Sequence, residues 1–295
     1  MARSKATLKT KEDPVEDDGP PPPEPLEPFV ARALSPMVRR IVAPNPNIFT
    51  GPGTNTYLVG IDEVVVIDPA VEDDQHLDAI VGCGGDRIRW IAVTHTHIDH
   101  ATGAAKLAAR TGAEVLGFNA KDGFKPDRKI GDGHIVNSTE FRLRAIHTPG
   151  HASNHLCYLV EEERVLLTGD LINESATVVI KPPDGNMTTY LESIEKLKKI
   201  PRLRSIAPGH GRLMENPAET FEWYISHRLS REAKVLSALS NAGTAKIADL
   251  LPVVYDDVGE DRWPIAMFSL HAHLLKLAAD GKVTGKTLAG KWSVS

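Results

Sequence analysis

A single heptapeptide, THTHIDH, limits what this chain can fold into more than any other part of its sequence. It follows an apolar run at residues 91–93 that is typical of a buried strand, and a helical pattern begins after it. Imidazole and carboxylate are ligands that suit zinc, manganese or iron. Because His95 and His97 are two residues apart, both can reach one ion, while Asp99 and His100 can reach a second ion beside it. The segment therefore predicts a metal centre at the end of a strand.

Three more candidate ligands follow predicted strands in the same way. His151 comes after Thr-Pro-Gly, Asp170 after Thr-Gly and His210 after Pro-Gly. A glycine next to each ligand lets the backbone crowd the site without a Cβ clash. A solvated loop would explain any one of these residues equally well. The combination of HxHxDH with three further ligands at strand ends is too specific for chance, and it strengthens the prediction of a metal centre.

The bulk composition excludes several classes of protein. With 295 residues, 41% of them apolar, the chain can build one large core and a smaller appended domain. A net charge of −5 argues against a protein that coats nucleic acid by bulk attraction. No apolar run is long enough to span a bilayer, and the N-terminus lacks a secretory signal, so we expect no membrane partner. The two cysteines predict reduced thiols, and hence a cytoplasmic protein, or one of the mitochondrial matrix in a eukaryote.

The sequence divides into three regions of different texture. Residues 1–28 combine charges with a run of prolines and have almost nothing to bury, which predicts a disordered tail. Residues 29–216 alternate strand-like apolar runs with helical patterns, which predicts an α/β sandwich with helices outside. Residues 217–295 read as three helices followed by a segment at residues 282–294 that alternates weakly, as a short hairpin would, which predicts a winged-helix-like C-terminal domain.

The ligand motifs resemble those of the metallo-β-lactamase superfamily over roughly residues 38–215. The resemblance implies an αββα sandwich with the ligands at one rim, and a hydrolase that uses a metal-bridging hydroxide. It also implies two Zn²⁺ ions per chain, with Mn²⁺ or Fe²⁺ as alternatives. Asp170 and Asp99 would be the catalytic carboxylates, the first holding the metals together and the second orienting the nucleophile. The implied ligands are His95, His97 and His151 for the first metal, Asp99, His100 and His210 for the second, and Asp170 for both.

Asp170 also separates the branches of that superfamily, because true β-lactamases lack the bridging aspartate whereas the glyoxalase II, lactonase and ribonuclease branches have it. The Asn55-Thr56-Tyr57 motif, the Thr-Pro-Gly-His run and the helical C-terminal region are similar to the β-lactamase-like protein 2 family. Its better-known members are endoribonucleases. The resemblance thus implies a phosphodiesterase that acts on single-stranded RNA.

The alternative is a hydrolase of a thioester, lactone or other small acyl substrate, as in glyoxalase II. Residues 217–295 carry equal numbers of basic and acidic residues, with no basic stripe. Aromatic residues make up only 5% of the chain, so stacking platforms are scarce. A protein that binds single strands is expected to have both a basic stripe and aromatic stacking platforms. On the alternative reading, the C-terminal helices would form a lid or the contact of a homodimer. A regulator with a decayed metal domain is disfavoured because no ligand is missing.

Three residues are weaker candidates for substrate contact. Asn154 and His155 closely follow His151, and Tyr190 opens a predicted helix after a loop that could overhang the pocket. A structural role is the alternative for each, since Asn154 and His155 could cap the next strand and Tyr190 could pack in the core.

Overall fold

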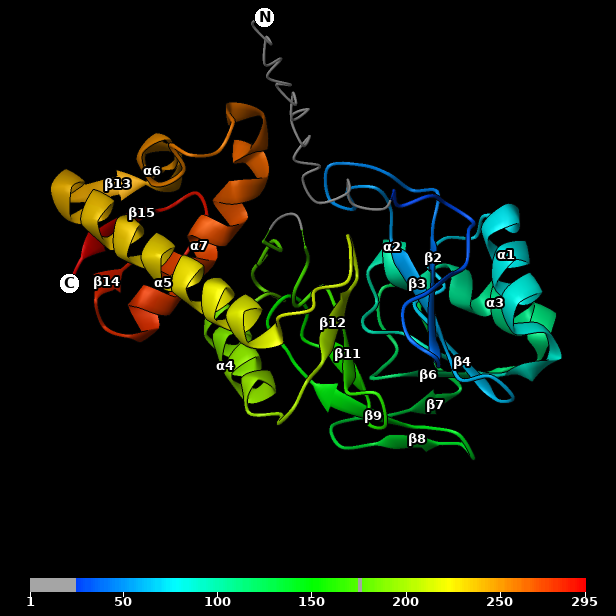
Figure 1. Ribbon diagram of the computed structural model, residues 1–295. Coiled ribbons are helices and arrows are strands. Elements are labelled where there is room, and N and C mark those ends of the chain that lie inside the picture. The colour runs from blue at the N-terminus through cyan, green and yellow to red at the C-terminus, as the bar shows by residue number, and fades with distance from the viewer. Residues whose placement is uncertain (1–24, 175–176) are drawn as a thin grey trace, which may run out of the picture.

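The computed structural model describes residues 25–174 and 177–295 (Figure 1). Of the predicted disordered tail, residues 1–24 lie outside the described residues. The remainder forms two sheets of seven and five strands, and a third sheet of three short strands near the C-terminus. The strands are β1 (Arg32–Ala33), β2 (Val38–Val42), β3 (Asn55–Val59), β4 (Val64–Ile67), β5 (Ile88–Ala92), β6 (Glu114–Gly117), β7 (Arg128–Lys129), β8 (Ile135–Asn137), β9 (Arg142–His147), β10 (Leu156–Val160), β11 (Val165–Gly169), β12 (Ser205–Pro208), β13 (Thr244–Lys246), β14 (Val283–Thr284) and β15 (Lys291–Val294).

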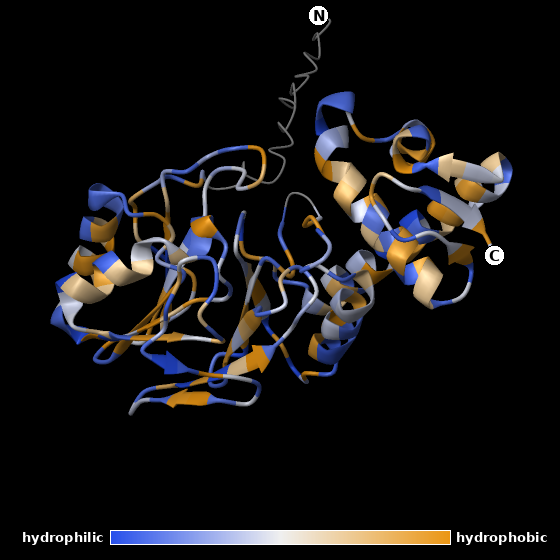
Figure 2. Cartoon of the chain, turned by 180° about the vertical axis from the view of Figure 1, so that it is seen from behind, coloured by the Kyte–Doolittle hydropathy of each residue, from blue (hydrophilic) through white to orange (hydrophobic). Residues whose placement is uncertain are grey.

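The two large sheets pack face to face because their strands bury apolar side chains on both sides. Tyr57 and Ile67 of the first sheet share one core with Leu143 and Tyr158 of the second. The outer side of the first sheet is covered by α1 (Asp74–Gly84) and α3 (Gly103–Thr111). The outer side of the second sheet is covered by α4 (Met187–Lys198). These helices carry apolar and hydrophilic residues in alternation, as expected for helices that bury one side (Figure 2). The predicted αββα sandwich is confirmed.

The order of the strands determines where the loops meet. The first sheet has the order β1 to β7, and the second has the order β12-β11-β10-β9-β8. β11 is parallel to β12, and both β9 and β11 are antiparallel to β10. The C-terminal ends of β9, β11 and β12 therefore lie at the same edge of their sheet, where the loops after these strands can form one site.

The C-terminal region has a core of its own, to which Leu239, Leu250, Leu270 and Trp292 contribute. The helices of this region are α5 (Pro217–Ala242), α6 (Ile247–Val254) and α7 (Trp263–Ala279). β14 and β15 form the predicted hairpin, and β13, which we did not expect, pairs with the free side of β15. The predicted winged-helix-like domain is thus confirmed. Short helical segments complete the chain at α2 (Ile98–Ala101), η1 (Gly85–Arg87) and η2 (Glu260–Arg262).

α5 is shared by both parts of the molecule. Phe221 and Tyr224 in its first turns are buried with the residues that cover the second sheet, whereas Val235 and Leu239 lie in the C-terminal core. Figure 1 shows this helix running from the side of α4 to the C-terminal strands. Its 26 residues span about 39 Å at 1.5 Å per residue. Across the described residues, each helix is either too short or too polar to cross a bilayer.

Candidate metal centre

All seven predicted ligands meet at one edge of the sandwich, in the loops after β5, β9, β11 and β12. Their donor atoms form two groups. In the first, His97 Nδ1 lies 2.9 Å from His95 Nε2 and 3.0 Å from His151 Nε2. In the second, Asp99 Oδ2 lies 3.6 Å from His100 Nε2 and 3.5 Å from His210 Nε2. Segments that lie more than a hundred residues apart in the sequence thus supply one cluster.

Asp170 lies between the two groups and presents one carboxylate oxygen to each. Its Oδ1 lies 3.4 Å from His100 Nε2 and 3.2 Å from His210 Nε2. Its Oδ2 lies 3.5 Å from His151 Nε2, in the first group. A carboxylate in this position has the geometry needed to bridge two cations.

The donor set fits a pair of divalent cations. Nitrogen ligands at about 2.0–2.1 Å from a tetrahedral zinc ion lie about 3.3 Å from one another, close to the separations of 2.9 to 3.6 Å found here. The buried Nε2 of His100 has no hydrogen-bond partner among the described residues, and a cation at this point would satisfy it. These residues are therefore chemically and geometrically suited to metal.

The electrostatics differ between the two groups. Burial, together with His151, lowers the pKa of His97 to about 4, so its imidazole is neutral and offers the lone pair that a metal needs. Burial also tends to lower the pKa of His100, but the carboxylates of Asp99, Asp170 and Asp68 hold it well above its usual value. Three carboxylates thus surround His100, and their negative charge attracts a cation.

Four of the five histidine ligands are oriented by a hydrogen bond to the ring nitrogen that faces away from the other ligands. Such partners fix the tautomer and the ring plane of a ligand. The pairs are His95 Nδ1 with Thr94 Oγ1 at 3.1 Å, His100 Nδ1 with Asp68 Oδ2 at 2.8 Å, His151 Nδ1 with the Val179 carbonyl at 2.8 Å, and His210 Nδ1 with the Gly53 carbonyl at 3.3 Å.

Asp68 is a site residue that the sequence reasoning missed. Besides its contact with His100, its carboxylate accepts hydrogen bonds of 2.7 Å from the Thr94 amide and the Thr94 hydroxyl. The side chain thus holds both a ligand and the start of the THTHIDH segment. Asp68 directly follows the apolar strand β4, so the strand-end signal that identified Asp170 was also present here.

Replacing Asp68 with asparagine should weaken metal binding by about 10- to 100-fold, because an amide cannot act as the charged acceptor for His100. Competition against a chromophoric chelator would measure the affinity. Asp62→Asn is a matched control, since Asp62 lies exposed in the turn before β4. Equal affinities for the two variants would contradict an orienting role.

Asn173 and Tyr224, which the sequence reasoning also missed, tie α5 to the ligands. Asn173 Nδ2 donates to Asp170 Oδ1 over 3.3 Å, and Asn173 Oδ1 accepts from the His210 amide over 3.1 Å. The Tyr224 hydroxyl in turn accepts from the Asn173 amide at 2.9 Å and donates to the Asn173 carbonyl at 2.5 Å. A helix of the C-terminal region thereby fixes a residue that touches two ligands.

Tyr224→Phe should weaken metal binding by about tenfold and destabilise the protein by about 1–3 kcal/mol, because the buried amide and carbonyl of Asn173 lose their partner. Chelator competition and denaturant unfolding would measure the two effects. Tyr255→Phe serves as the control, since the Tyr255 hydroxyl makes no hydrogen bond to the described residues. An unchanged metal affinity in Tyr224→Phe would show that the contact does not reach the ligands.

The three weaker candidates for substrate contact are wrong for a common reason, which is that their side chains are buried. His155 accepts a hydrogen bond from the Asp170 amide at 3.2 Å and contacts the Thr148 hydroxyl at 2.9 Å. The Tyr190 hydroxyl donates to the Leu171 carbonyl at 2.8 Å. Asn154 donates to the Thr96 hydroxyl at 2.9 Å. His155 and Asn154 thus support the ligand loops, and Tyr190 packs in the core.

A cavity of about 530 Å³ connects the metal centre to the C-terminal region. His151, Asp170 and His210 line one part of it. Another part is lined by residues of the loop before β3, of α5, of the segment between α6 and α7, and of α7 itself. These include Ile48, Phe49, Trp223, His227, Arg228, Arg231, Tyr255, Asp257 and Arg262. The centre thus opens into a space in which a substrate would contact both parts of the molecule.

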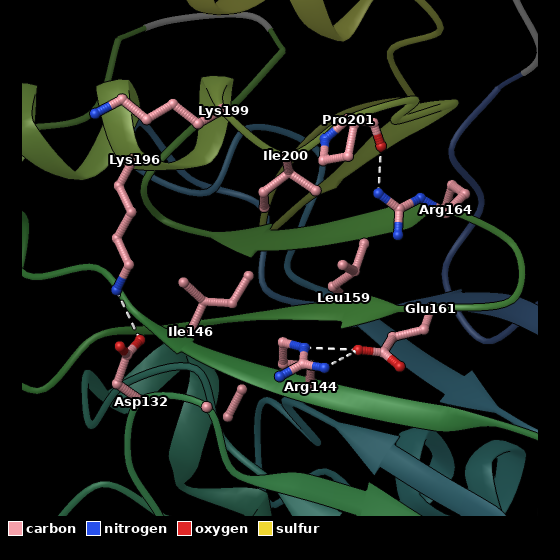
Figure 3. Close-up of a pocket in the computed structure, with 12 residues that line it drawn as sticks. Asp132, Arg144, Ile146, Leu159, Glu161, Arg164, Lys196, Lys199, Ile200 and Pro201 are labelled. Carbon is pink, nitrogen blue, oxygen red and sulfur yellow. Dashed lines mark hydrogen bonds and ion pairs between the residues drawn. The ribbon is translucent and has the colours of Figure 1, made fainter.

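A second cavity, of about 520 Å³, lies between α4 and the second sheet and contains none of the predicted ligands (Figure 3). Most of its charges are already paired within the wall, as Lys196 is with Asp132 and Arg144 is with Glu161. We therefore place the candidate site at the first cavity.

The sequence matches two family models. The model described as the metallo-beta-lactamase superfamily matches residues 49–210, and that of the beta-lactamase associated winged helix domain matches residues 247–292. A beta-lactamase-like protein 2 homolog of Drosophila melanogaster is 32% identical over 280 residues, which cover 88% of this chain and 93% of the relative. An atrochrysone carboxyl ACP thioesterase of Aspergillus fumigatus is 30% identical over 246 residues, which cover 77% and 76%.

Solved structures share the fold. A metallo-beta-lactamase family protein from Thermus thermophilus superposes with a TM-score of 0.74 at 21% identity, over 89% of this chain and all of that one. A beta-lactamase domain protein from Burkholderia ambifaria gives a TM-score of 0.76 at 18% identity, over 90% and 94%. At these coverages both similarities extend into the C-terminal region.

Proposed function

Since the chain belongs to the metallo-beta-lactamase superfamily, and is therefore a hydrolase, we propose that it cleaves phosphodiester bonds in single-stranded RNA with two zinc ions bound. The observation that carries this proposal is that aromatic and cationic side chains line the cavity next to the metal centre. Trp223 and Arg228 of α5 and Arg262 of η2 line the cavity that holds the metal centre. Aromatic faces and cations together suit a single strand, whose bases stack and whose phosphates are charged.

The residues of the centre have separate tasks in this chemistry. The first group and the second group would each hold one cation, with Asp170 shared between them. Bound there, the cations would supply a water-derived nucleophile near neutral pH and stabilise the negative charge that develops on the phosphate. Asp99 has a side chain 23% exposed, against 13% for Asp170. It is therefore the carboxylate of the centre that incoming water reaches most easily, and it would orient that water.

Trp223 is the best-placed stacking surface for a base. Its side chain is 54% exposed and lies 5.0 Å from the His227 ring at an interplanar angle of 18°, so one face is already supported. Trp223→Ala should lower kcat/KM for single-stranded RNA by about 5- to 150-fold, from the loss of about 1–3 kcal/mol of stacking. Leu229→Ala removes a similarly exposed apolar side chain of α5 outside the cavity lining, and it should have no effect. Equal losses in both variants would contradict stacking.

A specific observation favours a second function, the hydrolysis of an acyl thioester. Ile48 and Phe49 are 53% and 61% exposed at the cavity, and together with Trp223 they offer an apolar surface to an acyl chain. Relatives named as thioesterases support the same candidate.

One comparison distinguishes the two functions. The metal-loaded full chain is incubated with single-stranded RNA, with duplex RNA, and with a panel of acyl thioesters and lactones. We expect internal cleavage of the single strand and little of the duplex. Asp170→Asn, purified in the same way, shows whether a contaminating nuclease is responsible, because the contaminant would survive the substitution. Intact RNA beside rapid thioester hydrolysis would overturn the proposal in favour of the second function.

A further inference from the structure

Arg228 is a buried cation on the wall of the substrate cavity. It lies on α5, is only 3% exposed, and lines the cavity together with the ligands His151 and Asp170. No carboxylate among the described residues forms an ion pair with it. A buried charge without a counter-charge costs several kcal/mol, so its retention at this point needs an explanation.

The neighbouring arginine shows how the protein compensates such a charge elsewhere. Arg231, one turn further along α5, is 8% exposed, and its guanidinium forms a two-pronged ion pair with Asp257 at 2.7 and 2.8 Å. Its guanidinium also lies 4.5 Å from the centre of the Tyr255 ring. The charge of Arg231 is thus already neutralised within the protein, and this residue has no need of an anion from a substrate.

The groups that contact Arg228 directly are neutral instead. Its Nη2 donates to the Val178 carbonyl at 2.5 Å, and its guanidinium lies 5.1 Å from the centre of the Tyr190 ring. Its buried Nε has no hydrogen-bond partner among the described residues. A carbonyl and an aromatic face hold the side chain in place, but neither cancels its charge.

The same short segment that holds Arg228 also holds a metal ligand. Val178 accepts from Arg228, and the next carbonyl, that of Val179, contacts His151 Nδ1 at 2.8 Å. The segment is fixed further by the Ile180 amide, which donates to Ser269 Oγ of α7 at 3.2 Å. Arg228 and the metal centre are therefore held at a constant spacing along one cavity wall.

We propose that Arg228 is the centre of a subsite for an oxyanion of the substrate, next to the bond that is cleaved. That this oxyanion is a phosphate of the RNA backbone rests on the proposed function. The carboxylate of an acyl substrate is also an oxyanion and could occupy the same subsite. A guanidinium makes two parallel hydrogen bonds to either group. The subsite therefore selects substrates with a negative charge close to the scissile bond.

The test combines two changes, one in the protein and one in the substrate. Short single-stranded RNAs carry a neutral methylphosphonate at one position at a time, and kcat and KM are measured for the natural chain, Arg228→Gln and Arg228→Lys. In the natural chain we expect one flanking position at which neutralisation lowers kcat/KM by about 10- to 100-fold, mainly through KM. In Arg228→Gln, kcat/KM for the unmodified RNA should be lower by the same factor. The methylphosphonate should cause no further loss of kcat/KM in this variant.

A purely structural role for Arg228 gives a different result. The substitution and the methylphosphonate would then reduce kcat/KM independently, and their effects would multiply. Arg262→Gln is the control, because Arg262 is an exposed cation of the same cavity lining. In this variant, a methylphosphonate at the flanking position should still lower kcat/KM. If Arg228→Gln fails to fold, Arg228→Lys takes its place, because lysine keeps the positive charge but cannot make two parallel hydrogen bonds. In Arg228→Lys the methylphosphonate should lower kcat/KM by a smaller factor than in the natural chain. A natural chain with no sensitive flanking position would overturn the subsite.

A parallel arm separates this inference from the proposed function. Two acyl thioesters of equal length, one ending in a carboxylate and one uncharged, are compared with the same variants. If RNA is not cleaved but the charged thioester is preferred by the natural chain and not by Arg228→Gln, the subsite stands and the proposed function fails. If the natural chain also shows no preference between the thioesters, the subsite is wrong for both substrate classes.

Discussion

Replacing Asp170 with asparagine should abolish hydrolysis, with kcat/KM falling by at least about 1,000-fold while the fold is preserved. The reason lies in the two oxygens of this carboxylate, one beside His210 and one beside His151. An amide keeps the volume but removes the negative charge and turns an N–H toward an imidazole. Several kcal/mol of transition-state stabilisation by the metals is then lost, at a factor of ten for every 1.36 kcal/mol.

Steady-state kinetics and elemental analysis of the purified variant would check this expectation. Asp132→Asn removes an exposed carboxylate of the same domain, one that pairs with Lys196 outside the metal centre, and it should keep full activity and metal content. Retained turnover in Asp170→Asn, at a normal metal content, would contradict the bridging role.

The second large effect should come from the metals themselves. Exhaustive chelation of the full chain should remove all activity, and about two equivalents of zinc or manganese per chain should restore it. Chelation should also lower the thermal midpoint, because a metal that binds only the folded chain stabilises it by about 2.7 kcal/mol at a free concentration 100 times its Kd. A chain purified without chelators that contains no metal, and that gains no activity from zinc or manganese, would exclude a metal-dependent hydrolase at this site.

The positions of the ligands could be predicted from the sequence because they depend on local signals. Strands that run in the same direction end at one edge of a sheet, so polar residues directly after apolar runs converge, as His151 and His210 do. Asp68 carries the same signal, but a lone aspartate before proline also has an ordinary explanation as a turn residue.

Other parts of the site could not be predicted, because they depend on how distant segments pack. The contact between Asn173 and Tyr224 spans 51 residues and exists only where α5 lies against the second sheet. His155 was misassigned because closeness to a ligand along the chain says nothing about the direction of a side chain. Its ring points inward, beneath Asp170. The gathering of Trp223 and Arg228 at one cavity likewise follows from the docking of a helix.

Because α5 is continuous, it limits the width of the substrates that can enter the cavity. The helix is anchored at one end by Phe221 and at the other by Leu239, in two separate cores, so no hinge between these anchors can widen the cavity. Substrates that are too broad should therefore be excluded outright instead of being admitted by domain opening. A mutation that tilts the C-terminal end of α5 would also move Tyr224, which contacts Asn173. Such a mutation, although remote from the metal centre, would therefore change the affinity for metal.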